Sequence, residues 1–217
     1  MMLPAEEDPL APSFSPDALQ AYLPEDGVAV FNLDVKRLCA ASAFQKGFHN
    51  VLQQILRKDE LGLGWLPQAG IDPWRDLEEA RILISSRALF DPLFLLHGHF
   101  DLSRFQTGPG KLTQQTVTSN VGRFTYYEHP DRRRGEVVKL ALVGDYLVVC
   151  DAQAPVLAAL RQAVMASPTA PLDSPFRDLL SKVDRQQPLW FAVSMEKLRP
   201  VPRLDSMALE LILRPIF

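Results

Sequence analysis

The segment His97-Gly98-His99 is the part of this sequence that comes closest to a metal site. Residues two apart on a β-strand point to the same face, so two imidazoles placed in this way can share one Zn²⁺ ion. A catalytic zinc site needs a third protein ligand, and the remaining histidines, His49 and His129, show no ligand spacing. We therefore expect His97 and His99 to be solvent-facing or partly exposed and to bind no metal. We also expect no cofactor.

The most basic stretch of the chain is Arg132-Arg133-Arg134, which lies between Asp131 and Glu136. Clustered guanidinium groups attract phosphate or an acidic partner. Three charges in a turn flanked by acidic residues are also common at the solvated tip of a hairpin, and we favour that interpretation. A contact of these arginines with an anion, with a partner or with the chain's own acidic N-terminal tail is the alternative hypothesis.

Four carboxylates lie close to Trp74 in the sequence: Asp72, Asp76, Glu78 and Glu79. General acid/base chemistry needs two carboxylates that face one cleft. Asp72 directly precedes Pro73, and this order is typical of a helix N-cap followed by a proline in the first helical position. We expect Asp72 to be that cap and Glu78 and Glu79 to lie on the helix surface, which leaves no acid/base pair.

The sequence lacks the short motifs of common enzyme classes. It contains no Gly-x-Ser-x-Gly, no P-loop and no Gly-x-Gly-x-x-Gly. Cys39 and Cys150 each lie in an apolar stretch, where a free thiol behaves as a small hydrophobic residue. A disulfide between them is the less favoured alternative. We assign no catalytic residue.

Composition indicates a globular protein with enough apolar residues for its own core. The chain has 217 residues, of which 47% are hydrophobic and 23% charged, and its net charge is −3. That balance argues against a strongly basic nucleic-acid-binding protein. No stretch approaches the roughly 18 apolar residues of a membrane span. Residues 1–26 contain no Lys or Arg and no apolar h-region, so we expect a cytoplasmic protein, or an exported one if the true start lies upstream.

The elements that would position these residues are mostly consecutive strands. Gly144-Asp145 joins two apolar runs, 136–143 and 146–151, and such a two-residue link is typical of an antiparallel hairpin. The remaining strands are expected at 28–34, 80–86, 92–100, 114–120, 123–128 and 188–195, with a loop at Asp91-Pro92. The polar strands 114–120 and 123–128 indicate a sheet edge or a solvated face. We predict an α+β fold in two layers: a mainly antiparallel sheet with helices 43–58, 153–165 and 173–183 packed on one face.

Three regions divide the chain. Residues 1–14 are expected to be a disordered acidic tail, 15–186 the α+β domain, and 187–217 the start of a second, incomplete repeat unit. Within the domain, Asp34 is expected to cap a short helix through Leu38. The predicted core consists of Phe31, Leu33, Phe48, Leu52, Ile82, Ile84, Leu95, Leu140, Leu142, Val148, Leu157, Leu160, Leu180 and Trp190.

The repeat rests on an internal similarity at an offset of 160 residues. Residues 28–38 read VAVFNLDVKRL and residues 188–198 read PLWFAVSMEKL, which aligns Phe31 with Phe191 and Leu33 with Val193. Both segments are an apolar strand that runs into a short basic helix. A match of this length also arises by chance from shared secondary structure. Finding both strands in one sheet would support the repeat.

The order of several segments resembles a family of uncharacterised bacterial proteins. The segments are LPEDGVAVFNLDVKRL, GIDPWRDLEEARILIS, PLFLLHGHFD, VKLALVGDYLVV, APVLAAL and PLWFAV, which span residues 23 to about 198. That family shares an LP-x-D strand opening, a GIDP-x-x-D segment and an LxGxFD strand. The resemblance implies no activity. It implies proteins that are usually exported and that often continue into a second unit.

We expect a non-enzymatic binding or structural module, because catalytic motifs are missing. The alternatives are an enzyme with a dispersed, motif-less site and a truncated paralogue without an independent role. Residues 204–217 (LDSMALELILRPIF) are densely apolar, and leaving them in water costs about 25 cal/mol per Å². We therefore expect this segment to pack on its own domain, to bind a protein partner or to drive self-association.

Overall fold

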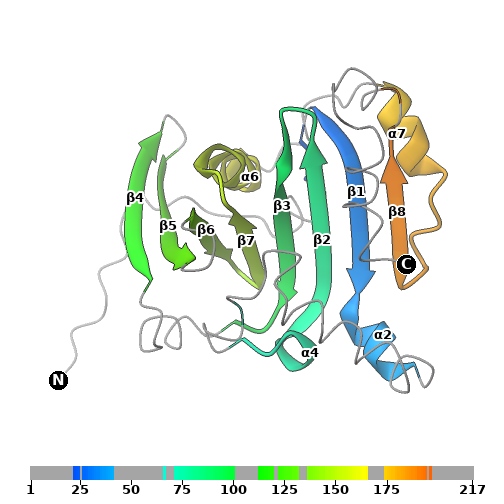
Figure 1. Cartoon of the computed structure of the whole chain (residues 1–217), viewed down its shortest axis with the longest axis horizontal. Coiled ribbons are helices and arrows are strands. Elements are labelled where there is room, and N and C mark those ends of the chain that lie inside the picture. The colour runs from blue at the N-terminus through cyan, green and yellow to red at the C-terminus, as the bar shows by residue number, and fades with distance from the viewer. Residues whose placement is uncertain are drawn as a thin grey trace.

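The structure, a computed structural model, is built around one eight-stranded sheet in which every neighbouring pair is antiparallel. The strand order is β4-β5-β6-β7-β3-β2-β1-β8, so β4 and β8 form its two edges (Figure 1). This confirms the predicted α+β fold with a mainly antiparallel sheet. The structure describes residues 22–24, 26–41, 66, 71–100, 112–119, 122–131, 136–165, 174–194 and 196.

The strands lie close to the predicted ranges. They are β1 Gly27–Asp34, β2 Leu77–Ser85, β3 Ala88–Gly98, β4 Thr113–Ser119, β5 Gly122–Asp131, β6 Glu136–Val143, β7 Tyr146–Cys150 and β8 Leu189–Val193. The β6–β7 hairpin turns at Gly144-Asp145 as expected, and Gly144 has the positive φ of 57° that glycine tolerates best. The polar strand β4 is an edge strand, which confirms that prediction.

The prediction of a loop at Asp91-Pro92 is wrong, because both residues lie inside β3. The chain turns earlier, at Ser86 and Arg87, where the backbone N–H of Arg87 donates to Ser85 Oγ at 3.1 Å. Proline has no N–H for a strand ladder and is tolerated in a strand only where none is needed. Pro92 lies at such a place, because the β2–β3 register shifts next to it and β7 pairs with β3 only from Phe94 onward.

The described helices are α2 Val35–Ala40, α4 Pro73–Asp76, α6 Gln153–Met165 and α7 Ser174–Ser181. Two of them, α2 and α4, begin at the predicted caps Asp34 and Asp72. The Asp34 carboxylate accepts from the backbone N–H of Arg37 at 2.8 Å, and the Asp72 carboxylate accepts from that of Trp74 at 3.0 Å. Both contacts satisfy an N–H group that the first turn leaves without a helical partner. No described helix has the length and hydropathy of a transmembrane span.

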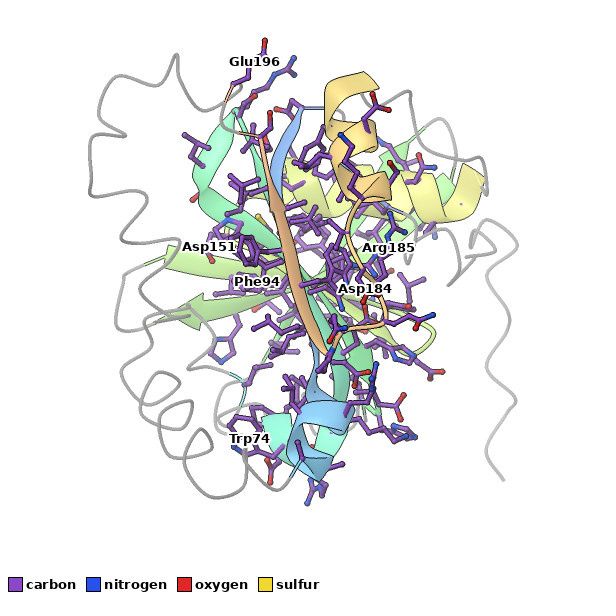
Figure 2. All side chains as sticks on the ribbon, turned by 90° about the vertical axis from the view of Figure 1, so that its right-hand side faces the viewer. Trp74, Phe94, Asp151, Asp184, Arg185 and Glu196 are labelled. Atoms are coloured by element: carbon purple, nitrogen blue, oxygen red, sulfur yellow. The ribbon has the colours of Figure 1, made fainter. Side chains whose placement is uncertain are left out.

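A small apolar cluster of Val28, Ala29, Phe31 and Ile84 joins β1 to β2, and two larger apolar clusters lie on the sheet. One joins α6 and α7 to residues such as Val30, Leu83 and Leu95, and both helices lie on the same side of the sheet (Figure 2). The other includes Phe94, Leu96, Leu140, Leu147 and Val149. Several predicted core residues are buried, and others are partly buried; the buried ones are Phe31, Ile84, Leu95, Leu140, Val148, Leu160 and Leu180.

Several predictions lie outside the described residues. They are the acidic tail 1–14, the helix 43–58 with the core residues Phe48 and Leu52, the arginines Arg132, Arg133 and Arg134, and the apolar segment 204–217. The two similar strands of the internal repeat are described, and they are direct neighbours in one sheet. Phe31 lies opposite Phe191 in the β1–β8 register. The repeat itself stays a prediction.

Candidate functional site

His97 lies at the end of β3. A hydrogen bond from Lys36 is the largest cause of a lowered pKa at Glu78, and both His97 and His99 lie close enough to its carboxylate to lower this pKa further. β3 ends at Gly98, so His99 lies beyond the strand and is exposed. His97 is half-buried: its ring lies 4.8 Å from that of Tyr146, and its Nδ1 is 3.5 Å from Glu78 Oε2. The described residues contain no group of three or more His, Cys, Asp or Glu that could hold a metal ion. The histidines therefore carry no assigned chemistry.

Glu78 and Glu79 do not lie on a helix surface, so that prediction is wrong. Helix α4 ends at Asp76 after a single turn, and both glutamates belong to β2. Glu78 Oε1 accepts from Lys36 Nζ of α2 at 2.9 Å, and this hydrogen bond lowers the pKa of Glu78. The sequence signal for a helix start was correct, but the strand pairing that begins at Leu77 stops the helix.

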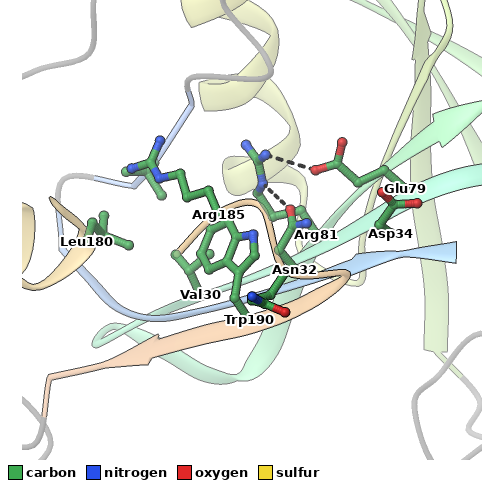
Figure 3. A pocket seen from close by; sticks show the side chains of 10 residues that line it. Val30, Asn32, Asp34, Glu79, Arg81, Leu180, Arg185 and Trp190 are labelled. Atoms are coloured by element: carbon green, nitrogen blue, oxygen red, sulfur yellow. Dashed lines mark hydrogen bonds and ion pairs between the residues drawn. The ribbon is translucent and has the colours of Figure 1, made fainter. Parts of the chain in front are cut away.

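A hollow of about 460 Å³ lies between β1, β2, β8 and the chain that follows α7 (Figure 3). Arg81 spans its floor: Nε donates to Asn32 Oδ1 at 3.1 Å, and a terminal nitrogen donates to Glu79 Oε1 at 3.0 Å. At its rim the Arg185 guanidinium lies 5.9 Å from the centre of the Trp190 ring, a cation–π contact.

The charges that line this hollow balance one another. Among the described residues that line it, the guanidinium groups belong to Arg81 and Arg185, and the carboxylates to Asp34 and Glu79. Asp34 is occupied as the cap of α2, and Glu79 is paired with Arg81. A buried polar network whose members satisfy one another rigidifies a fold. The contacts of Arg81 with Asn32 and Glu79 therefore link β1 to β2 at this hollow.

Both cysteines are free thiols, as the sequence favoured. Cys150 is buried, and burial raises its pKa to about 11; burial also raises the pKa of the less buried Cys39. Because the thiolate is the reactive form, a raised pKa makes a cysteine less reactive at neutral pH.

We expect iodoacetamide at pH 8 to alkylate Cys39 at least about 100-fold faster than Cys150, since Cys150 is both buried and almost fully protonated. Peptide mass spectrometry of a time course measures the two rates. In urea both cysteines should react at similar rates, which serves as the control. Equal rates in the folded protein would show that Cys150 is accessible as a thiolate.

The outer edge of β8 is the feature best suited to binding (Figure 2). The N–H of Asp34 donates to Pro188 O at 2.7 Å, and the N–H of Ser194 donates to Val28 O at 2.8 Å. In an antiparallel pair, alternate residues direct their backbone groups to opposite sides. The N–H and C=O groups of Leu189, Phe191 and Val193 therefore face away from β1. Within the described part of the chain, no strand pairs with them.

Two side chains of this edge are apolar and exposed. Leu189 is 38% exposed and Phe191 is 46% exposed, and both stand out among the large hydrophobic residues of the described chain. Residues 188–194 (PLWFAVS) contain no charge. Natural edge strands are commonly protected by charged residues, prolines or bulges, because an unprotected edge is a template for another strand. The opposite edge, β4, has the polar sequence TQQTVTS.

Phe191 is the open end of an apolar row that crosses the sheet. It stacks on Phe31, with ring centres 5.8 Å apart and ring planes inclined by 21°. The strand registers continue this row from Phe31 through Ile82, Phe94, Val149, Leu140 and Tyr127. A strand added to β8 would extend the row, because opposite residues of paired strands share one face.

The chain before β8 is ordered by side-chain contacts. The Asp184 carboxylate accepts from Gln187 Nε2 at 2.9 Å and from the backbone N–H of Gln186 at 3.0 Å. Both hydrogen bonds lower the pKa of Asp184, and the bond from Gln187 has the larger effect. Arg37 of α2 donates to the carbonyl of Gln186. These contacts fix the point at which β8 begins, so a partner strand would meet an edge of defined register.

Sequence reasoning predicted the strand 188–195 but did not identify Leu189 and Phe191 as binding residues. The available signal was an uncharged run that is apolar at every position from Leu189 to Val193. That pattern fits a central strand equally well, and only the strand order places it at an edge.

The fold and this site together define a class: an antiparallel α+β domain with one polar and one apolar sheet edge. Comparisons of the chain with protein-family models, with curated proteins and with solved structures found no match.

Proposed function

We propose that the protein is a non-enzymatic binding module that takes up an extended protein segment as an additional strand on β8. The observation that carries this proposal is the outer edge of β8, with which no strand of the described residues pairs and beside which Leu189 and Phe191 are exposed. In strand addition, main-chain hydrogen bonds supply affinity, and side chains at alternate positions supply specificity. The outer edge of β8 offers both.

The proposal implies a ligand with alternating apolar residues and no charge at its centre. β1 is a strand of this kind, and β8 already pairs with it along its inner edge. A fluorescein-labelled peptide with the β1 sequence, GVAVFNLD, is therefore a suitable probe. It should bind the full-length protein saturably, and the Phe191→Lys variant should bind it at least about 10-fold more weakly, because a charged edge residue opposes strand pairing.

Fluorescence anisotropy at low protein concentration measures both affinities. The matched control is Val137→Lys, which places the same charge at another exposed apolar residue, on β6 away from the edge. This control should bind the peptide like the unmodified protein. Peptide binding that is absent, or that is unchanged by Phe191→Lys, would contradict the proposed function.

A further inference from the structure

We infer that the segment that β8 takes up is β8 of a second copy of this chain, in antiparallel orientation and with the two Phe191 residues opposite each other. This inference rests on the proposed function and names its partner. It would join two eight-stranded sheets into one across a two-fold axis.

The first argument is the composition of β8. In an antiparallel pair of identical strands, residues near the two-fold axis meet their own copies, so a charge there would meet the same charge. Residues 188–194 carry no charge at all. The register centred on Phe191 also sets Trp190 opposite Ala192 of the other copy, which places a large side chain beside a small one.

The second argument is the existing pairing of β8 with β1. The two strands have similar sequences, and in the sheet Phe31 lies opposite Phe191, its own equivalent in the internal alignment. This sheet therefore already pairs two strands of this pattern about a pair of stacked phenylalanines. A second β8 would repeat that arrangement on the outer side of Phe191.

The third argument is the apolar row that ends at Phe191. On its inner side the Phe191 ring is stacked on Phe31, whereas 46% of the residue is still exposed. Pairing two copies in the Phe191-centred register brings the open ends of two such rows together. Phe191, the most exposed large apolar residue of the described chain, would then be covered by its equivalent in the other copy, as in a two-fold interface.

Sedimentation equilibrium of the full-length chain tests this inference. One short strand pair makes a small interface, so we expect a weak dimer. At about 100 µM, most of the unmodified 24.3 kDa chain should be dimeric. Phe191→Lys and Phe191→Glu should each weaken the dimer at least about 100-fold, and an equimolar mixture of the two should regain it, because lysine then faces glutamate. Val137→Lys should leave it unchanged.

Three results would overturn the inference. They are a monomeric unmodified protein, a dimer that Phe191→Lys does not weaken, and a mixture of the two variants that stays monomeric. If the protein is a monomer and the amides of Leu189, Phe191 and Val193 are nevertheless protected from hydrogen exchange, the occupant of the β8 edge is residues 204–217 of the same chain. If the β1 peptide still binds to a monomer, the proposed function stands and only the second copy is wrong as the partner.

Discussion

Replacing Gly98 by alanine is expected to destabilise the protein by about 3 kcal/mol. A Cβ atom at this position would lie 2.0 Å from the backbone oxygen of Asp76, far inside van der Waals contact. That carbonyl accepts from the N–H of His99 at 2.8 Å, and the Asp76 carboxylate accepts from the N–H of Asp72 at 2.8 Å. A methyl group fits only if the chain moves at Asp76 and Leu77, where α4 ends and β2 begins. That movement would strain both hydrogen bonds to Asp76.

Urea unfolding followed by tryptophan fluorescence measures this loss. Gly144→Ala is the matched control, because Gly144 is exposed in a hairpin and its positive φ makes alanine costly by only about 1 kcal/mol. We expect the Gly98 variant to lose clearly more stability than the Gly144 variant. Equal losses would show that the junction yields easily and that Gly98 is not needed for close packing.

This glycine changes the interpretation of His97-Gly98-His99. Taken as sequence, the two histidines were the nearest candidate for a metal site, although we expected no metal there, and the glycine between them carried no information. In the structure the glycine is the constrained residue, since the backbone of Asp76 passes directly over it. Such a contact joins residues 22 positions apart in the chain, so no local pattern could predict it.

Local signals predicted the parts of the fold that depend on neighbouring residues. The caps at Asp34 and Asp72 and the turn at Gly144-Asp145 were all correct, because each depends on a side chain or a φ angle within a few residues. The loop at Asp91-Pro92 failed because a register shift between two paired strands removes the need for a proline N–H. That shift is a property of the pairing and not of β3 alone.

In the candidate site, too, one part depends on neighbouring residues and another on the arrangement of the whole sheet. The uncharged apolar run PLWFAVS predicted a strand, and the two-residue period of a strand places Leu189, Phe191 and Val193 on one face. Whether that face is buried or open depends on the number of strands that pair with β8, which is set by the order of the whole sheet. Binding residues on an edge strand are therefore recognised from topology, whereas catalytic residues are often recognised from motifs.

The second large effect is expected for Phe176→Ala, which should lower the free energy of unfolding by about 3–5 kcal/mol. Phe176 of α7 is completely buried, in the cluster that joins α6 and α7 to the sheet. A Cβ atom added to Gly27 would lie 3.5 Å from a carbon of its ring, so the ring packs against the first residue of β1. Removing the Phe176 ring leaves a cavity where α7 packs against β1, the strand that pairs with β8.

Phe191→Ala is the matched control, because it makes the same substitution on an exposed residue. It removes the stack on Phe31 but opens no cavity, so we expect a loss of about 1 kcal/mol or less. Urea unfolding of the two variants gives the comparison, at a concentration where the unmodified protein is monomeric. Similar losses in the two variants would mean that α7 contributes little to the core, and that β1 and β8 are held by strand pairing alone.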